Sequence, residues 1–143
     1  LDKKKNFLNS FFYKFIKKVN SKFKDLIIIK NFKKNEKLIK IYPKFDLQVY
    51  PSKCEAFGLI ILETIASSLP IICSNYPVYK EILKKNTIYF DPDNPDDIAD
   101  SIKIYITNSK TKHRNTKNLL KISKKFDWKI CSRQTFKFIK ELS

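Results

Sequence analysis

Apolar residues recur along the chain in two different periods. Near the N-terminus they follow the helical spacing of three and four residues, at Leu8, Phe12, Phe15, Val19 and Phe23, while Lys14, Lys17 and Lys18 lie on the other side. This pattern predicts an amphipathic helix whose aromatic stripe faces a core. Residues 26–29 then form a short continuous apolar run, which predicts a strand buried on both faces.

The same alternation continues to the end of the chain. Strands are predicted over 47–50, 70–74 and 88–90, and helices over 34–42 (closed by Pro43), 58–68, 78–83, 116–125 and 128–142. Strands that alternate with helices are typical of a parallel sheet between helical layers. The predicted fold class is therefore α/β, with a doubly wound architecture.

Two helix starts are marked by capping residues. Asn94 can cap a helix, Pro95 suits the first helical position, and the two acids that follow favour the positive end of the helix. We expect Ile98, Ile102 and Ile106 to form the buried face of that helix. Asp127 is the predicted cap of the last helix.

Composition narrows the classes of function. The 143 residues, enough for one domain, carry a formal net charge of +16 but only one glycine, Gly58. A single glycine excludes P-loop and dinucleotide fingerprints, which need several at fixed spacing. The lysines are spread along the chain without an Arg-rich block, which favours a solvated basic surface over a specific nucleic-acid site. No apolar run approaches the roughly 20 residues of a membrane span.

Nucleophilic and metal-ligating side chains are sparse. Cys54, Cys73 and Cys131 are odd in number and far apart, which fits a reduced, cytosolic protein better than a disulfide scaffold or zinc cluster. His113, the only histidine, is predicted to be a solvated loop residue. The chain begins at Leu1 and contains no methionine, so we expect it to be a piece of a longer protein.

The candidate chemistry lies in the loop after the strand 47–50 and in the helix that follows. Ligands of parallel α/β sheets bind at the carboxyl ends of strands. Gly58 would let a ligand approach the free N–H groups of the helix start, although an ordinary turn glycine is an equal alternative. Glu63 lies among apolar neighbours, so it needs a partner within the fold or a ligand. Glu55, taken alone, would be an exposed loop acid.

Residues 46–63, DLQVYPSKCEAFGLIILE, closely resemble the E-x7-E signature of the retaining nucleotide-sugar glycosyltransferases of group 1, also classified as family four. The resemblance covers nearly all of residues 26–142, through segments 36–42, 68–74, 76–82, 89–92 and 126–128. There are departures from the family pattern. Ala56 stands where glycine is commonest, Ile60 replaces a proline, Ser67 and Ser68 replace a small residue and a glycine, and Gln48 interrupts an apolar strand.

The resemblance implies a GT-B type enzyme with two facing Rossmann-like domains, of which this chain is the C-terminal, donor-binding half. Residues 1–125 would form a partial donor-binding domain, and residues 126–143 a helix that closes it. Glu55 is implied as the catalytic residue that contacts donor-sugar hydroxyls, and Glu63 as a ribose ligand. The implied donor-binding residues also include Ala56, Phe57, Gly58 and Leu59. Lys5 is a further candidate, as a phosphate ligand.

The resemblance also implies partners and a setting. The substrate would be a UDP- or GDP-linked sugar, with no metal or other cofactor. The acceptor, a glycan or lipid-linked sugar of polysaccharide biosynthesis, would bind an N-terminal domain outside this chain, so we expect the chain alone to be inactive. The expected location is cytoplasmic, with peripheral contact at the inner face of the membrane left open. Two alternatives also stay open: a catalytically incomplete remnant of such an enzyme, and a basic, non-enzymatic module that binds nucleic acid or a membrane surface.

Overall fold

The computed structural model describes residues 14, 17–18, 21–22, 38 and 40–142, and it divides the chain into two units, Leu1–Lys33 and Lys34–Ser143. In the first unit the described residues are helical and exposed, as predicted for Lys14, Lys17 and Lys18. The apolar positions of that predicted helix, the predicted strand 26–29 and Lys5 lie outside the described residues. So does most of the predicted helix 34–42.

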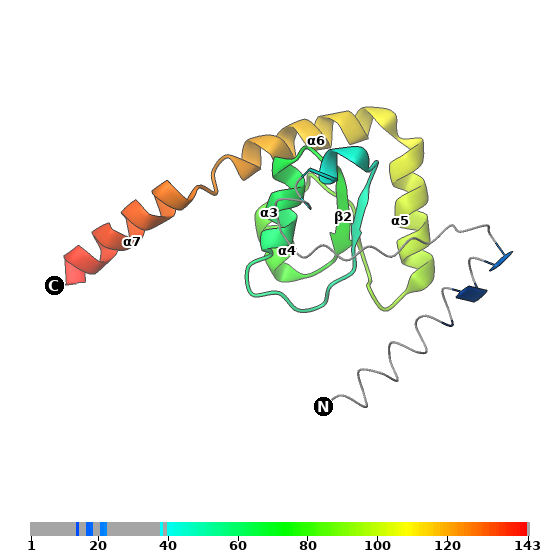
Figure 1. The fold of residues 1–143 in the computed structure, drawn as a ribbon, viewed down its shortest axis with the longest axis horizontal. Coiled ribbons are helices and arrows are strands. Elements are labelled where there is room, and N and C mark those ends of the chain that lie inside the picture. The colour runs from blue at the N-terminus through cyan, green and yellow to red at the C-terminus, as the bar shows by residue number, and fades with distance from the viewer. Residues whose placement is uncertain (1–13, 15–16, 19–20, 23–37, 39, 143) are drawn as a thin grey trace. The chain divides into compact units, whose positions relative to one another are not determined.

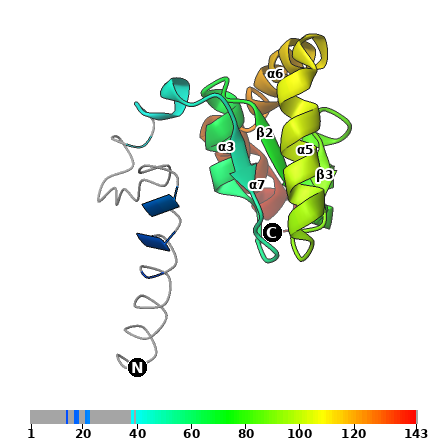
Figure 2. The same cartoon turned by 90° about the vertical axis from the view of Figure 1, so that its right-hand side faces the viewer.

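The second unit is built on a parallel sheet of three strands, β1 (Gln48–Tyr50), β2 (Ile71–Ser74) and β3 (Tyr89–Phe90), in the order β1-β2-β3 (Figure 1). All three strands begin within one residue of their predicted positions. The central strand β2 is buried along its whole length, because helices cover both faces of the sheet. Figure 2 shows α3 and α5 on opposite sides of β2.

The helices of this unit surround the sheet, and their bounds are η1 (a 3-10 turn, Tyr42–Lys44), α3 (Leu59–Ala66), α4 (Pro77–Leu83), α5 (Pro95–Thr107), α6 (Ser109–Ser123) and α7 (Trp128–Leu142). On one face of the sheet, α3, α4 and α6 enclose a core cluster of Ile61, Ile65, Ile71, Cys73, Tyr79, Ile82, Leu83 and Leu119. On the other face, α5 covers a smaller cluster of Ile72, Phe90 and Tyr105. Successive residues of β2 therefore point to opposite cores, as strand geometry requires.

Gln48, the polar residue in an otherwise apolar strand, has a partner in the core. The hydroxyl of Thr64, which is fully buried in α3, lies 2.7 Å from both the Gln48 side-chain oxygen and the backbone oxygen of Ile60, and its one hydrogen can be donated to either. A buried hydroxyl without partners would cost free energy, so the glutamine helps to tie α3 to β1.

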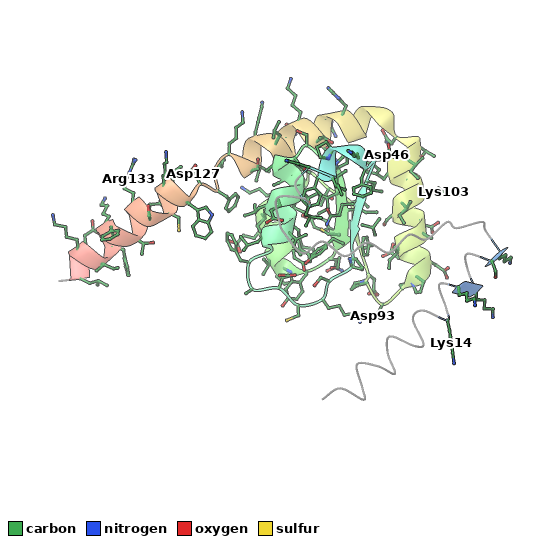
Figure 3. All side chains as sticks on the ribbon, in the orientation of Figure 1. Lys14, Asp46, Asp93, Lys103, Asp127 and Arg133 are labelled. Atoms are coloured by element: carbon green, nitrogen blue, oxygen red, sulfur yellow. The ribbon has the colours of Figure 1, made fainter. Side chains whose placement is uncertain are left out.

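Both predicted caps are confirmed. The Asn94 side-chain oxygen accepts from the backbone N–H groups of Asp96 and Asp97 at 3.0 and 3.2 Å. Asp127, between α6 and α7 in Figure 3, accepts from the N–H groups of Lys129 and Ile130 at 2.7 and 3.3 Å. These bonds satisfy donors that have no partner inside the helix.

The prediction for the buried face of α5 is wrong at its end. Ser101 and Tyr105 are buried, Ile98 and Ile102 are half-buried, and Ile106 is 68% exposed. At 3.6 residues per turn, a residue eight positions after Ile98 lies about 80° around the helix from it. The side chain of Ile106 has therefore left the face that meets the sheet.

Two further local predictions need correction. His113 is exposed as predicted, but it lies within α6, which begins at Ser109 rather than at residue 116. This helix is polar at its start and meets the core through Leu119 near its end, so a polar sequence alone could not reveal it. Pro43 does not close a helix but lies within the first turn of η1, where a residue without an N–H group is tolerated.

The last helix, α7, differs from the others because it has no buried residue. Its bounds match the prediction, and its aromatic residues are exposed, including Trp128, Phe136 and Phe138. Within the part of the chain that the structure describes, no helix combines the length and apolar character that a membrane crossing needs.

Candidate functional site

The loop of residues 51–58 connects the carboxyl end of β1 to the start of α3, at the edge of the sheet where the sequence placed the candidate site. Two side chains from neighbouring elements of the fold form hydrogen bonds to its backbone. The hydroxyl of Ser74, the last residue of β2, hydrogen bonds to the backbone oxygen of Ser52. The hydroxyl of Tyr79, in α4, donates to the same oxygen at 3.4 Å. Neighbouring elements therefore set the path of the loop.

Glu55 is half-buried in this loop and does not behave as a free surface acid. Its carboxylate accepts a hydrogen bond from the hydroxyl of Tyr50, the last residue of β1. Burial, followed by this hydrogen bond, raises the pKa of Tyr50 above its ordinary value, so the phenol keeps its proton and remains a donor. The Tyr50 ring in turn packs edge-on against Tyr79, with 5.7 Å between ring centroids.

Gly58 caps the N-terminus of α3 in the left-handed conformation, with φ 81° and ψ 45°. This backbone conformation favours glycine and strains most other residues. A Cβ atom at this position would meet Tyr79, Ile61 and Ile82 at 3.7–3.8 Å, which is ordinary contact. The glycine is therefore required by the backbone conformation rather than by crowding.

The backbone at the start of α3 offers hydrogen-bond donors. Among the backbone hydrogen bonds recorded for residues 40–142, none is donated by the amides of Phe57, Gly58 or Leu59, and no side chain caps this helix. Free N–H groups and the positive end of the helix dipole suit an anionic or hydroxylated ligand. Ala56 is exposed beside them, and the half-exposed Phe57 ring packs edge-on against Phe126, with 5.9 Å between centroids.

Glu63 lies one turn further along α3, and its surroundings differ from those of Glu55. It is half-buried, and one of its carboxylate oxygens accepts from the hydroxyl of Tyr42 in η1 at 3.4 Å. Burial, and then the negative charge of Glu63, raise the pKa of Tyr42. Glu63 thus has the partner within the fold that its apolar neighbours required.

The charged groups near the loop lie at the surface. Lys53 forms an ion pair with Asp93 in the loop between β3 and α5, and both side chains are exposed. Within the described residues, no group of three or more His, Cys, Asp or Glu side chains is arranged to hold a metal ion.

The two cysteines nearest the loop differ in exposure. Cys54 is exposed in the loop, whereas burial raises the pKa of Cys73 to about 12 and leaves that thiol protonated.

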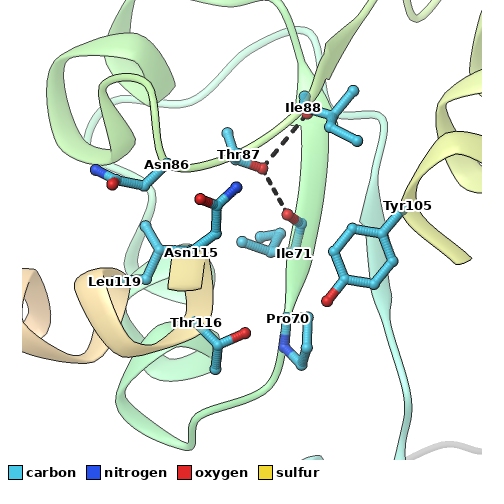
Figure 4. A pocket seen from close by; sticks show the side chains of 9 residues that line it. All are labelled: Pro70, Ile71, Asn86, Thr87, Ile88, Tyr105, Asn115, Thr116 and Leu119. Atoms are coloured by element: carbon cyan, nitrogen blue, oxygen red, sulfur yellow. Dashed lines mark hydrogen bonds between the residues drawn. The ribbon is translucent and has the colours of Figure 1, made fainter. Parts of the chain in front are cut away.

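A small cavity lies at the other end of the sheet, where β2 begins (Figure 4). Its volume is about 10 Å³, enough for one water molecule at most. Thr87 closes one side by donating to the backbone oxygen of Ile71 at 2.5 Å, and burial raises the pKa of Tyr105, on another side, to about 12. The cavity is too small for a nucleotide or a sugar.

Sequence reasoning identified Glu55, Gly58 and Glu63 but missed the residues that support them. Two of these supporting residues end strands, Tyr50 in β1 and Ser74 in β2, and the third, Tyr79, lies in α4. Each of them contacts at least one partner that is distant in sequence. The one available signal was the tyrosine at the end of an otherwise aliphatic and polar strand.

Comparison with known proteins agrees with this architecture. Residues 13–121 match the family described as "Glycosyl transferases group 1". The chain belongs to this family, and its parallel α/β sheet with flanking helices is consistent with a Rossmann-like, GT-B type glycosyltransferase domain. The family assigned from the sequence is therefore confirmed.

Three curated relatives are bacterial glycosyltransferases. The chain is 32% identical to the "O-antigen chain mannosyltransferase B" of Escherichia coli over 108 aligned residues. The aligned region is 76% of this chain and 28% of that protein. It is 35% identical over 83 residues to the "O-antigen biosynthesis glycosyltransferase WclY" of Escherichia coli (58% and 21%). It is 38% identical over 63 residues to the "O-antigen chain mannosyltransferase RfbU" of Salmonella typhimurium (44% and 18%). The chain thus spans less than a third of the length of each relative.

Proposed function

We propose that this chain is the donor-binding part of a retaining glycosyltransferase, which transfers a sugar from a UDP- or GDP-linked donor to a growing glycan. The observation that carries the proposal is the loop 51–58, in a member of the group 1 family. This loop sets a hydrogen-bonded carboxylate, Glu55, beside the free amides at the start of α3. Polar groups of these two kinds suit a diphosphate and the hydroxyls of a sugar.

In the proposed complex the amides of Phe57, Gly58 and Leu59 bind the sugar and the diphosphate, and Glu55 accepts hydrogen bonds from sugar hydroxyls. Glu63 accepts from the ribose, and Ala56 leaves the approach open. The bond between the anomeric carbon and the diphosphate oxygen breaks, and the acceptor oxygen bonds to the same face of that carbon. The leaving phosphate takes the acceptor proton. In the proposed reaction the transfer needs no metal ion or other cofactor.

The relatives narrow the proposal for the sugar. Two of the three are named as O-antigen chain mannosyltransferases, and the third as an O-antigen biosynthesis enzyme. We therefore favour mannose as the transferred sugar and a bacterial surface polysaccharide, or its lipid-linked precursor, as the acceptor. The wide spacing and odd number of cysteines support a cytoplasmic location.

The test uses the full-length protein that contains this chain. It is incubated with UDP- and GDP-linked hexoses, and release of the free nucleotide diphosphate is measured with and without a chelator. We expect turnover of a mannosyl donor at a rate that the chelator does not change, and a product that keeps the donor's anomeric configuration by NMR. A folded protein that binds neither UDP nor GDP in calorimetry would contradict the proposal.

A further inference from the structure

The hydrogen bond between Tyr50 and Glu55 joins a rigid element to a loop. Tyr50 is the last residue of β1 and is held in the sheet opposite Cys73 of β2. Glu55 lies five residues later, in a loop without regular secondary structure. A glutamate side chain has several rotatable bonds and loses considerable rotamer entropy when it is held in one orientation. The Tyr50 hydroxyl is a hydrogen-bond donor fixed in the sheet, so it can hold the Glu55 carboxylate in place before the substrate binds.

Tyr50 is itself held in place by its surroundings. Its ring packs edge-on against the fully buried ring of Tyr79, which also packs against Tyr76 with 5.5 Å between centroids. The Tyr79 hydroxyl and the Ser74 hydroxyl meet at the backbone oxygen of Ser52. The same group of aromatic side chains therefore supports the ring that holds Glu55 and the backbone that carries it.

The protonation state of the phenol suits this role. Burial, and then the hydrogen bond to Glu55, raise the pKa of Tyr50, so at neutral pH the phenol keeps its proton and can donate to the carboxylate. A hydrogen bond to a charged acceptor is stronger than one between neutral groups. Within the described residues, no other side chain is recorded as a donor to Glu55.

We propose that Tyr50 is a positioning residue, which holds the Glu55 carboxylate in the orientation that meets the donor sugar, with Tyr79 fixing the Tyr50 ring. The inference rests on the proposed function, in which Glu55 contacts sugar hydroxyls. It adds a residue that does not touch the substrate and whose effect passes through Glu55. Catalysis requires that groups such as the Glu55 carboxylate be held precisely by the residues around them.

The test is Tyr50→Phe in the full-length enzyme, which removes the hydroxyl and leaves the ring on Tyr79. We expect kcat to fall about tenfold, the size expected for loss of a hydrogen bond to a charged group. The donor KM and the affinity for the free nucleotide diphosphate should change by less than about twofold, because the amides at the start of α3 stay in place. Calorimetry measures the affinity and steady-state kinetics measures kcat.

Tyr89→Phe is the matched control. It also removes a tyrosine hydroxyl, one that donates to the backbone oxygen of Lys84 at 2.5 Å, with the backbone oxygen of Tyr79 at 3.3 Å, and that belongs to β3 and does not contact Glu55. We expect it to leave kcat unchanged. In a Glu55→Gln background, Tyr50→Phe should add less than about a twofold loss, because two residues that act through one contact are not additive.

The outcomes separate the two proposals. If Glu55→Gln lowers kcat and Tyr50→Phe does not, the positioning role is wrong and the proposed function stands. If Glu55→Gln itself leaves kcat unchanged, the proposed function of Glu55 is wrong. A Tyr50→Phe protein that loses nucleotide affinity as strongly as kcat, or whose Tm falls by more than about 5 °C, would show that the hydroxyl serves the fold and would overturn the positioning role.

Discussion

The two glutamates of the candidate site, eight residues apart, have similar partners and different surroundings. Each is half-buried and each accepts from a tyrosine hydroxyl. Glu55 lies in a loop at the carboxyl edge of the sheet, beside free amides, whereas Glu63 lies within α3 and meets Tyr42, which is only 5% exposed. The comparison teaches that two carboxylates at a fixed spacing along the chain can lie in different environments, one in a loop and one within a helix.

The largest expected effect comes from the glycine between them. Gly58→Val should strongly weaken nucleotide-diphosphate binding in the full-length enzyme, because a β-branched residue resists the left-handed backbone that presents the free amides at the start of α3. The left-handed backbone should also cost about 1–2 kcal/mol of stability. Calorimetry and thermal melting measure the two effects. Gly58→Asn is the control, since asparagine tolerates this conformation: it should keep more of the nucleotide affinity and show a smaller fall in Tm than Gly58→Val. Unchanged affinity in both variants would mean that the helix start does not touch the ligand.

The next effect separates binding from turnover at Glu55. Glu55→Gln should lower turnover by about ten- to a hundredfold, because a charged acceptor is replaced by a neutral one. The affinity for the free nucleotide diphosphate should stay within about twofold, since that ligand lacks the sugar. Steady-state kinetics and calorimetry give the two values. Equal losses in turnover and in nucleotide affinity would place Glu55 against the nucleotide rather than the sugar.

Glu63→Gln tests the other side of the comparison. If Glu63 binds ribose, donor and free nucleotide diphosphate should both bind about tenfold more weakly, while the Tm of the ligand-free protein changes little. Tyr42→Phe is the control, because it removes the partner within the fold without touching the carboxylate. A large fall in Tm on Glu63→Gln, with nucleotide affinity unchanged, would leave Glu63 a structural residue held by Tyr42 and the ribose role wrong.

A smaller effect is expected beyond the other end of α3, where Ser68 adopts φ 60°. The family pattern carries glycine at this position, and serine is strained in the left-handed region. Ser68→Gly should therefore raise the free energy of unfolding by about 0.5–1 kcal/mol, after allowance for the greater freedom of glycine in the unfolded chain. Denaturant titration measures this value. Nucleotide affinity should not change, in contrast to Gly58, and a loss of stability would contradict the assigned backbone strain.

The smallest effect concerns the exposed ion pair of the loop. Lys53→Ala removes the partner of Asp93 and should cost about 0.5 kcal/mol or less, because exposed ion pairs contribute little. Denaturant titration at low and high salt measures it. Turnover should stay within about twofold, since the loop is held by Tyr79 and Ser74 rather than by this pair. A tenfold loss of turnover would show that the surface contact positions the loop.

Local sequence determined most of the fold of the described residues. The three strands, the last helix and the caps Asn94 and Asp127 were predicted nearly to the residue. Each depends on hydrophobic periodicity or on a side chain that bonds to its own neighbours, so a short window of sequence contains the cause. The polar start of α6 was missed, because its order comes from packing near its end rather than from its own pattern.

At the site, the sequence by itself determined which residues are candidates: Glu55, Gly58 and Glu63. Only the tertiary structure decided what holds them. Tyr42 reaches Glu63 from 21 residues away, and Ser74 and Tyr79 reach the Ser52 carbonyl from 22 and 27 residues away. These contacts depend on strand register and on how α3 and α4 pack against the sheet, which no local window of sequence contains.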